Sequence, residues 1–543
     1  MKLEWGVAAL QLGTARGRDI SELESLYQDG TAPDRAMIGG NEVATPSQPL
    51  PRDDKINRDK WSLNCTSSTS GNECAKAIDG STDTFWQSQN SATEYQNITI
   101  TLEANNSVSG LTVVPRQINP VAALIEQHQI LVSQDNINWE LVAYGTWWNN
   151  TAQKLSVFQP RYAKYLRLSA AASQGIAIAD IEVYTIDYIP PNDELGSWGP
   201  TIDLPLVPVA GAVDPQSGEV VVWSVFPSRK FVEGKGVKTQ TATWNPRENA
   251  VTRSATNTNH DMFCPGIATD QEGKVVVTGG TAPSTTSIYN TITQQWYQDG
   301  FLNKPRGYQA SNSLSDGRIF VIGGSYGSNV FGKDGEVYDM KTNKWTMLPS
   351  ALASTMLTHD QRTYRQDHHG WTFAWDNGSV FQAGPSKGIH WYGTAGDGSV
   401  TPAGNHTGDE DAVCSNAVIP ATNRASIISI TDAKQAATVL PNAGGGMKSV
   451  RTFHTSVVLP DGSVFVNGGQ TVGLPFNETG AQLSPETFFP DLKDLQKGAT
   501  CKSQQPNTVI RVYHSIALLL QDGTVFTGGG GLYGNCAANH FDG

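Results

Sequence analysis

Three short segments of the chain contain cysteine, tyrosine and histidine side chains that can do metal chemistry. They are His-Asp-Met-Phe-Cys-Pro-Gly at 260–266, Arg-Gly-Tyr-Gln at 306–309 and Arg-Val-Tyr-His at 511–514. Imidazole, phenolate and thiolate side chains can all bind transition metals. If Cys264, Tyr308, Tyr513 and His514 meet at one point, the sequence predicts a metal site there.

A repeated β unit predicts where these three segments lie in the fold. Each copy has Asp, Asn, Glu or Ser before a glycine, followed by a β-rich run that mostly ends in a glycine pair. The unit's glycines are at 218, 273, 317, 378, 462 and 523. Nine residues before them stand Val209, Cys264, Tyr308, His369, Phe453 and His514. If each unit is a propeller blade, these side chains lie on equivalent inner strands and can converge on one axis.

The spacing of the units favours a seven-bladed type of kelch propeller that is incomplete in this sequence. Successive glycines lie 55, 44, 61, 84 and 61 residues apart, so the longest gap has room for an extra unit. Tyr289 precedes Trp296 by seven residues, and Tyr338 precedes Trp345 by seven. We expect these aromatic pairs to pack between adjacent sheets.

Two further regions precede the propeller. Residues 1–55 are polar and contain Pro-rich segments, which predicts a poorly ordered leader or propeptide. Residues 56–188 have short alternating strands separated by turn residues, the pattern of a jelly-roll β-sandwich. The Pro and Gly residues that follow mark a boundary, and residues 189–543 form the predicted propeller domain.

Composition indicates an all-β protein and excludes some partners. The chain has 543 residues, among them 54 Gly, 14 Trp and 16 Tyr, and no long amphipathic helical pattern. Its net charge of −13 argues against nucleic acid and against polybasic membrane attachment. No apolar stretch approaches the roughly 18 residues that a membrane span needs.

Several features indicate a secreted, extracellular protein. Seven Asn-x-Ser/Thr sequons are present, at Asn64, Asn97, Asn105, Asn149, Asn377, Asn405 and Asn477. Cys65 and Cys74 flank a short polar loop that suits a disulfide, and Cys501 with Cys536 is the expected second bridge. The first sixteen residues make a poor signal peptide because Glu4 interrupts a weakly apolar run, so we expect the true start to lie upstream.

The chain resembles the galactose oxidase family of fungal copper-radical alcohol oxidases. The strings that carry the resemblance are WSLNCTSSTSGNECAKAIDGSTDTFWQS, WGPTIDLPLVP, HDMFCPG, RGYQ, RTFHTSVVLPDG and RVYHS. The resemblance implies a discoidin-like, galactose-binding sandwich followed by a kelch catalytic domain. It extends from Asn57 to Asp542, almost the whole chain.

At the positions that match the family's motifs, the resemblance implies a copper site with a tyrosyl radical. Tyr308 would be an equatorial ligand joined by a thioether to Cys264, His514 a second equatorial ligand, and Tyr513 the axial tyrosine and base. The implied reaction oxidises a primary alcohol, such as D-galactose or a galactoside, to an aldehyde. O2 would be reduced to H2O2, and no organic cofactor is required.

The chain also departs from the family pattern. Tyr326 stands where the family stacks a tryptophan over the thioether. Arg365, Phe231 and Phe453 match residues that contact the sugar, whereas a family Tyr-Gln pair has no counterpart between residues 414 and 427. The sequence stops where relatives continue into a third β domain that donates a second copper histidine. We therefore expect the polypeptide as written to bind copper poorly.

The resemblance implies a calcium or sodium ion in the sandwich. Its expected ligands are the carbonyls of two residues and the side chains of four, namely Lys76 and Ala179 with Asp79, Ser81, Thr84 and Asp180. These are oxygen donors, which such hard cations prefer. The ion would be structural.

Two alternative functions stay open. One is an aryl or aliphatic alcohol oxidase of the same family, which Tyr326 makes credible. The other is a carbohydrate-binding kelch protein without redox activity. In either case we expect a monomer with small-molecule or carbohydrate partners.

Overall fold

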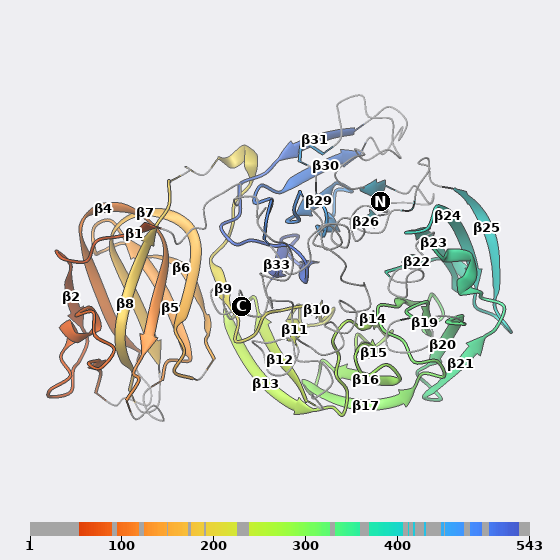
Figure 1. Ribbon diagram of the computed structural model, residues 1–543, viewed down its shortest axis with the longest axis horizontal. Coiled ribbons are helices and arrows are strands. Elements are labelled where there is room, and N and C mark those ends of the chain that lie inside the picture. The colour runs from red at the N-terminus through yellow and green to blue at the C-terminus, as the bar shows by residue number, and fades with distance from the viewer. Residues whose placement is uncertain are drawn as a thin grey trace, which may run out of the picture.

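The computed structural model describes residues 54–89, 95–118, 124–148, 150–171, 175–188, 190, 192–224, 238–325, 332–358, 369–405, 411, 416–418, 428–430, 447–449, 451–471, 478–490 and 499–530. Within these ranges the fold consists of β-strands with four short 3-10 helices, so the all-β prediction is confirmed. Among the helices described, none is long and apolar enough to cross a membrane. Figure 1 shows a sandwich beside a ring of small sheets.

The sandwich is built around three long antiparallel strands, β4 (Gln96–Pro115), β7 (Lys154–Ala171) and β8 (Ala177–Thr185). Alternate residues of β4 enter the core, where Ile98 and Ile100 are fully buried, because successive side chains of a strand point to opposite faces. Two register shifts interrupt the pairing of β4 with β7. Such irregularities bend strands. The strands therefore fold over into the predicted sandwich.

Shorter elements complete this module. They are β1 (Asp54–Lys55), β2 (Ser62–Cys65), β3 (Trp86–Gln87), β5 (Gln127–Ser133), β6 (Glu140–Thr146), β9 (Thr201–Asp203) and the 3-10 helices η1 (Cys74–Ala77) and η2 (Asp193–Leu195). The predicted disulfide between Cys65 and Cys74 is present, with the two Cα atoms 5.9 Å apart. It ties the end of β2 to η1.

The propeller contains seven small antiparallel sheets in the described part of the chain, five of four strands and two of two strands. The first sheet consists of β10 (Ala210–Val213), β11 (Val220–Ser224), β12 (Lys238–Asn245) and β13 (Ala250–Asn257). The second consists of β14 (Gly266–Thr269), β15 (Val275–Thr278), β16 (Thr285–Asn290) and β17 (Gln295–Phe301). The third consists of β18 (Ala310–Ser313), β19 (Ile319–Ile322), β20 (Gly335–Asp339) and β21 (Lys344–Leu348).

The remaining sheets complete the ring in Figure 1. The fourth sheet consists of β22 (Trp371–Ala374), β23 (Ser379–Gly384), β24 (Gly388–Gly393) and β25 (Ser399–Asn405), and the fifth of β26 (Asn416–Val418) and β27 (Ile428–Ile430). The sixth consists of β28 (Thr455–Val458), β29 (Val464–Asn467), β30 (Glu486–Pro490) and β31 (Ala499–Ser503), and the seventh of β32 (Ser515–Leu519) and β33 (Val525–Gly529). The 3-10 helices η3 (Ala353–Met356) and η4 (Asp376–Gly378) also lie in this domain. The β26–β27 sheet lies within the 84-residue gap, as predicted.

The first strand of each blade lies innermost and contacts the first strand of a neighbour. Contacts join β14 to β18, β18 to β22 and β28 to β32, and β32 also contacts β10. The last blade thus closes the ring against the first. Glycine pairs permit this approach: a Cβ on Gly279 would lie 2.3 Å from the carbonyl oxygen of Arg306 in the next blade. A Cβ on Gly468 would lie 2.2 Å from the carbonyl oxygen of Arg511.

The predicted aromatic pairs do pack between blades. The ring centroids of Tyr338 and Trp345 lie 5.1 Å apart, and those of Tyr289 and Trp296 lie 5.0 Å apart. The Trp345 indole N–H donates to Thr286 Oγ1 of the preceding blade at 2.9 Å. These rings therefore join neighbouring sheets, as expected for kelch blades.

The sandwich and the propeller share a buried junction. Strand β9 pairs in parallel with β6 and leads directly into the first blade. The Trp244 indole N–H donates to the Tyr144 hydroxyl at 3.0 Å across this junction. On the sandwich side, Asp203 of β9 accepts from His128 Nε2 at 2.7 Å, with both side chains almost fully buried. The linker is therefore fixed to the sandwich.

The prediction of a second disulfide is wrong for Cys501. This residue lies on β31 as a free thiol, and its S–H donates to Glu486 Oε2 on the neighbouring strand β30 at 3.2 Å. Burial raises the pKa of this thiol to about 12, and the adjacent carboxylate adds to the rise. Cys536 and Cys414 lie outside the described residues.

Candidate functional site

The residues aligned by the repeat share one unusual backbone conformation. Cys264, Tyr308, His369, Phe453 and His514 have φ angles of 56°, 63°, 52°, 55° and 67°. Each stands one or two residues before the inner strand of its blade, in the turn that enters it. Residues with a side chain seldom adopt this left-handed region, and they do so at a cost unless the surroundings fix them. Equivalent strain at five places identifies these turns as one repeated device, which we call the hub.

Backbone hydrogen bonds join consecutive hub residues. The Tyr308 N–H donates to the Cys264 carbonyl at 3.0 Å, and the His369 N–H donates to the Tyr308 carbonyl at 3.0 Å. Cys264 and Tyr308 therefore occupy neighbouring turns that are directly bonded. This is the juxtaposition that a link between their side chains requires.

Ring contacts extend across the hub. Tyr513 lies against His514 with centroids 3.9 Å apart and against Phe453 with centroids 5.2 Å apart. The Phe263 ring lies 5.1 Å from that of His514. Since Phe263 directly precedes Cys264, these contacts bring the last blade to the blade of the cysteine. These ring contacts therefore join three blades, those of Cys264, Phe453 and His514.

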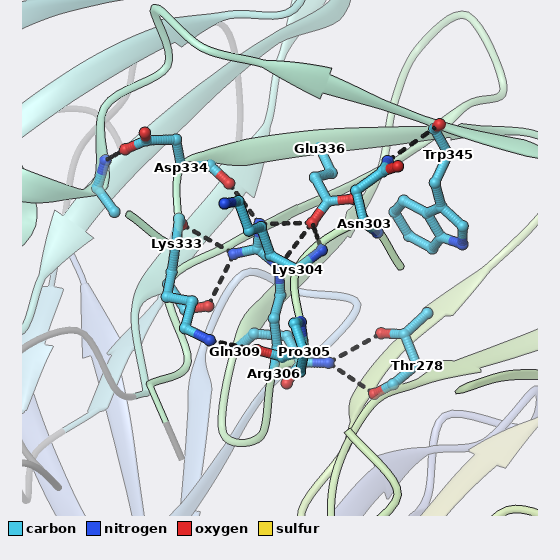
Figure 2. A network of polar contacts seen from close by, with 12 residues as sticks. Thr278, Asn303, Lys304, Pro305, Arg306, Gln309, Lys333, Asp334, Glu336 and Trp345 are labelled. Atoms are coloured by element: carbon cyan, nitrogen blue, oxygen red, sulfur yellow. Dashed lines mark hydrogen bonds and ion pairs between the residues drawn. The ribbon is translucent and has the colours of Figure 1, made fainter. Parts of the chain in front are cut away.

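A buried ion pair fixes the turn that carries Tyr308. Figure 2 shows Arg306 bonded to Glu336, with Nη2 2.7 Å from Oε1 and both side chains fully buried. The Arg306 Nη1 donates to the Gly323 carbonyl at 2.9 Å. Glu336 in turn accepts the backbone N–H groups of Asn303 at 2.8 Å and Lys304 at 3.0 Å. These contacts hold the turn just before Tyr308 to strand β20 and to the end of β19 in its own blade.

A second contact fixes the same turn to the preceding blade. Gln309 Nε2 donates to the Thr278 carbonyl at 2.6 Å, at the end of β15, as Figure 2 shows. Tyr308 therefore lies between two anchored residues, Arg306 and Gln309. This fixation accounts for a tyrosine in a strained conformation, because rigid surroundings leave the turn no relaxed alternative.

Other hub turns have equivalent anchors. Arg451 bonds Glu486 at 2.9 Å and the Gly468 carbonyl at 2.8 Å, beside Phe453. Burial alone would raise the pKa of Glu486, but Arg451 and a backbone N–H hold it below its ordinary value. Arg511 donates to the Gly529 carbonyl at 2.7 Å, two positions before Tyr513.

The turn of Cys264 uses a neutral histidine instead. His260 Nε2 lies 2.7 Å from the Gly279 carbonyl, and Nδ1 lies 2.9 Å from Ser287 Oγ. Because a carbonyl only accepts, Nε2 carries the proton and Nδ1 accepts from the hydroxyl. Burial lowers the pKa of His260 to about 4, which keeps the ring neutral. Sequence reasoning missed this anchor and both Arg–Glu pairs.

The hub donors fit copper. Tyr308, Tyr513 and His514 supply two phenols and an imidazole, the ligand types that copper(II) accepts. Desolvation lowers the pKa of His514 to about 3, with a further contribution from His369 nearby, so the imidazole is in its neutral, ligating form. Three predicted residues, Tyr326, Arg365 and Phe231, lie outside the described residues.

The predicted cation ligands of the sandwich already have protein partners. Asp79 Oδ2 accepts from Thr84 Oγ1 at 2.6 Å, and Asp79 Oδ1 accepts from the Ser81 N–H at 2.9 Å. Asp180 forms an ion pair with Arg58, with Oδ1 2.7 Å from Nη1. The same guanidinium lies 3.0 Å from where a Cβ would stand on the glycine after Asp79. The Arg58 guanidinium therefore lies beside both segments.

The remaining two predicted ligands lie close to these segments. Lys76 belongs to η1, which contacts β8, and Ala179 is fully buried in β8 beside Asp180. The structure therefore brings the two segments together, and calcium or sodium stays a prediction.

Comparison with known proteins identifies the family. The chain is 42% identical over 522 residues to a galactose oxidase of Gibberella zeae, which covers 90% of this chain and 76% of that protein. The chain belongs to the galactose oxidase family. The F5/8 type C domain model matches residues 62–182, and the Kelch motif model matches residues 306–351.

A solved structure agrees with this assignment. A fungal alcohol oxidase of the AA5 family, in complex with copper, is 35% identical and has a TM-score of 0.56. The match covers 62% of this chain and 73% of that one. The family relationship makes this chain an oxidoreductase of the copper-radical alcohol oxidase class, and it supports copper as the metal.

Proposed function

We propose that this protein oxidises primary alcohols, D-galactose and galactosides first, to aldehydes, and reduces O2 to H2O2. One observation carries the proposal: Cys264, Tyr308, Phe453 and His514 hold equivalent strained positions around one hub. The relative from Gibberella zeae bears the name galactose oxidase, which supports this substrate class.

Tyr308, Tyr513 and His514 are the proposed copper ligands. Copper, when bound, would orient the alcohol and accept one of the two electrons that the oxidation releases. The Tyr513 phenolate would accept the hydroxyl proton of the substrate. The oxidised Tyr308 phenol would take a hydrogen atom from the carbon, which leaves an aldehyde. In total the alcohol gives up two protons and two electrons, which reduce one O2 to H2O2, so the reaction balances.

The proposed radical site also needs a covalent modification. A thioether would join Cys264 Sγ to the ring carbon beside the Tyr308 hydroxyl. The thiol and the ring each lose one hydrogen, and O2 takes both as H2O2. The hydrogen-bonded turns of the two residues support this step.

The substrate preference has a second candidate. The solved relative is described as an alcohol oxidase with catalytic diversity in its family, which favours aryl or aliphatic alcohols as an alternative. Phe453 supplies an apolar wall at the hub in either case, while Arg365 and Phe231 are the proposed sugar contacts. Tyr326 is the proposed ring over the thioether.

Three proposals concern the rest of the molecule. The Cys65–Cys74 disulfide supports secretion, since disulfides persist in oxidising compartments. The F5/8 type C sandwich is the proposed carbohydrate-binding module, with an optional structural calcium or sodium ion. The protein is proposed to act as a monomer.

The test is an oxidase assay on the copper-loaded, full-length protein. H2O2 formation would be measured with D-galactose and with benzyl alcohol, with Tyr308→Phe as the inactive variant. Tyr297→Phe is the matched control, because this tyrosine lies on the outer strand β17. We expect slow galactose turnover that Tyr308→Phe abolishes, in keeping with the poor copper binding expected from the sequence. Copper-bound protein that oxidises neither alcohol would contradict the proposal and favour a binding function.

A further inference from the structure

His369 is the hub residue to which the proposed reaction gives no role. It has the same strained backbone as Cys264 and Tyr308, with φ 52°. Its blade directly follows that of Tyr308, and its N–H bonds the Tyr308 carbonyl at 3.0 Å. A hub position that only closed the ring would need no particular side chain. The side chain of His369 therefore needs its own account.

The imidazole of His369 lies against the phenol ring of Tyr308. Their centroids are 4.8 Å apart and their planes are inclined by 41°. This distance is within the range of favourable aromatic contacts. Elsewhere in the hub, the Tyr513 ring contacts those of His514 and Phe453.

Contacts between the two blades hold the turns of Tyr308 and His369 next to each other. Asn312 Nδ2 on β18 donates to the Thr372 carbonyl on β22 at 2.9 Å, which ties the two inner strands together. The residue after His369 is glycine, and a Cβ there would lie 2.6 Å from Met356 Cε. The His369 turn is therefore packed directly onto the Tyr308 blade. These contacts keep the backbones of the two turns next to each other.

We propose that His369 is a positioning residue that holds the Tyr308 ring in the orientation in which its carbon beside the hydroxyl meets Cys264 Sγ. This inference rests on the proposed thioether and deepens it. The backbone fixes the Tyr308 Cα, but the ring can still turn about its side-chain bonds. A ring packed against one face restricts that rotation, whereas a cavity in its place would release it.

The experiment measures thioether formation in the full-length protein after copper and O2 are added. Peptides containing residues 264 and 308 would be quantified over time by mass spectrometry, as linked or separate species. We expect His369→Ala to link roughly tenfold or more slowly, since a misplacement of about 1 Å can cost on the order of a hundredfold. His369→Phe restores a packed ring, so its rate should stay within about threefold of wild type.

His390→Ala is the matched control, because His390 is also a buried histidine of the β22–β25 sheet but bonds Gln382 away from the hub. We expect this variant to lose stability and to link at the wild-type rate. Near-ultraviolet circular dichroism and urea midpoints would establish that each variant is folded. The absorption band of the oxidised site gives a second readout, and its wavelength should shift in His369→Ala and not in His390→Ala.

The outcomes separate this inference from the proposed function. Wild-type protein that never links would overturn the thioether and with it both proposals. Linked wild type with an equally fast His369→Ala would overturn the positioning role alone. Equal slowing in His369→Phe and His369→Ala would also overturn it, because ring packing would then not be the cause.

Discussion

The blades of Tyr308 and Cys264 present neighbouring residues to the hub in the same left-handed conformation, yet different side chains anchor them. Arg306 and Glu336 form a buried ion pair behind Tyr308. A neutral His260 does the equivalent work behind Cys264, bonded to the Gly279 carbonyl and to Ser287. Both anchors reach the first glycine of their blade's glycine pair, through Gly323 and Gly279.

This difference shows which features of the hub are constant and which vary between blades. The strained turn and the close glycine approach recur, whereas the anchoring chemistry varies between ionic and neutral. A buried charge without its partner is far more costly than a lost neutral hydrogen bond. The Tyr308 turn should therefore be the more rigidly held of the two, and the more sensitive to substitution.

The largest effect is expected for Arg306→Met. Glu336 would stay fully buried without its cation, and removal of one partner of such a pair costs about 3–5 kcal/mol. The free energy of unfolding would be measured with urea, with Lys55→Met as the control because its pair with Glu182 is exposed. A loss below about 1 kcal/mol, the range of surface pairs, would contradict the anchor.

A smaller, pH-dependent effect is expected at His260. Its pKa is about 4 in the folded protein and 6.5 when unfolded, so the unfolded chain takes up a proton first as the pH falls. Stability from the neutral ring is complete above pH 6.5 and declines towards pH 4, by about 2 kcal/mol at pH 5. His260→Gln should lose this share of the pH dependence between pH 7 and pH 5, measured by urea unfolding. If the free energy of unfolding depends on pH identically in wild type and in His260→Gln, the assignment of a neutral His260 is wrong.

The smallest effect is expected for Ser287→Ala. It removes one neutral hydrogen bond from His260 Nδ1, which costs about 1 kcal/mol. The urea midpoint should shift less than in Arg306→Met. A midpoint shift in Ser287→Ala equal to or larger than that in Arg306→Met would contradict the proposed difference between the two anchors.

The sequence predicted the hub well because a repeat encodes position directly. Counting back from the repeated glycine identified five residues that all have positive φ. Val209, found by the same count, does not share this conformation, although it packs beside Cys264. The blade aromatics were predictable for the same reason. The sandwich was predictable from its alternating strands, and its disulfide from the short polar loop between Cys65 and Cys74.

The anchors and the Cys501 environment were not predictable, since they depend on register between distant strands. Glu336 is thirty residues from Arg306, and its role follows only from its place on β20. Cys501 appeared available for a bridge, but the pairing of β30 with β31 sets its thiol against Glu486. The ion pair of Arg58 with Asp180, a predicted cation ligand, was likewise not foreseen.

The most direct test of the account is the covalent state of Cys264 and Tyr308. The full-length protein would be loaded with copper under O2, digested, and analysed by mass spectrometry for the peptides that contain the two residues. The account predicts a single cross-linked species that is lighter than the sum of the two peptides by two hydrogens, and its absence from Cys264→Ser. Copper-bound protein in which the two peptides remain separate and the cysteine stays alkylatable would contradict it.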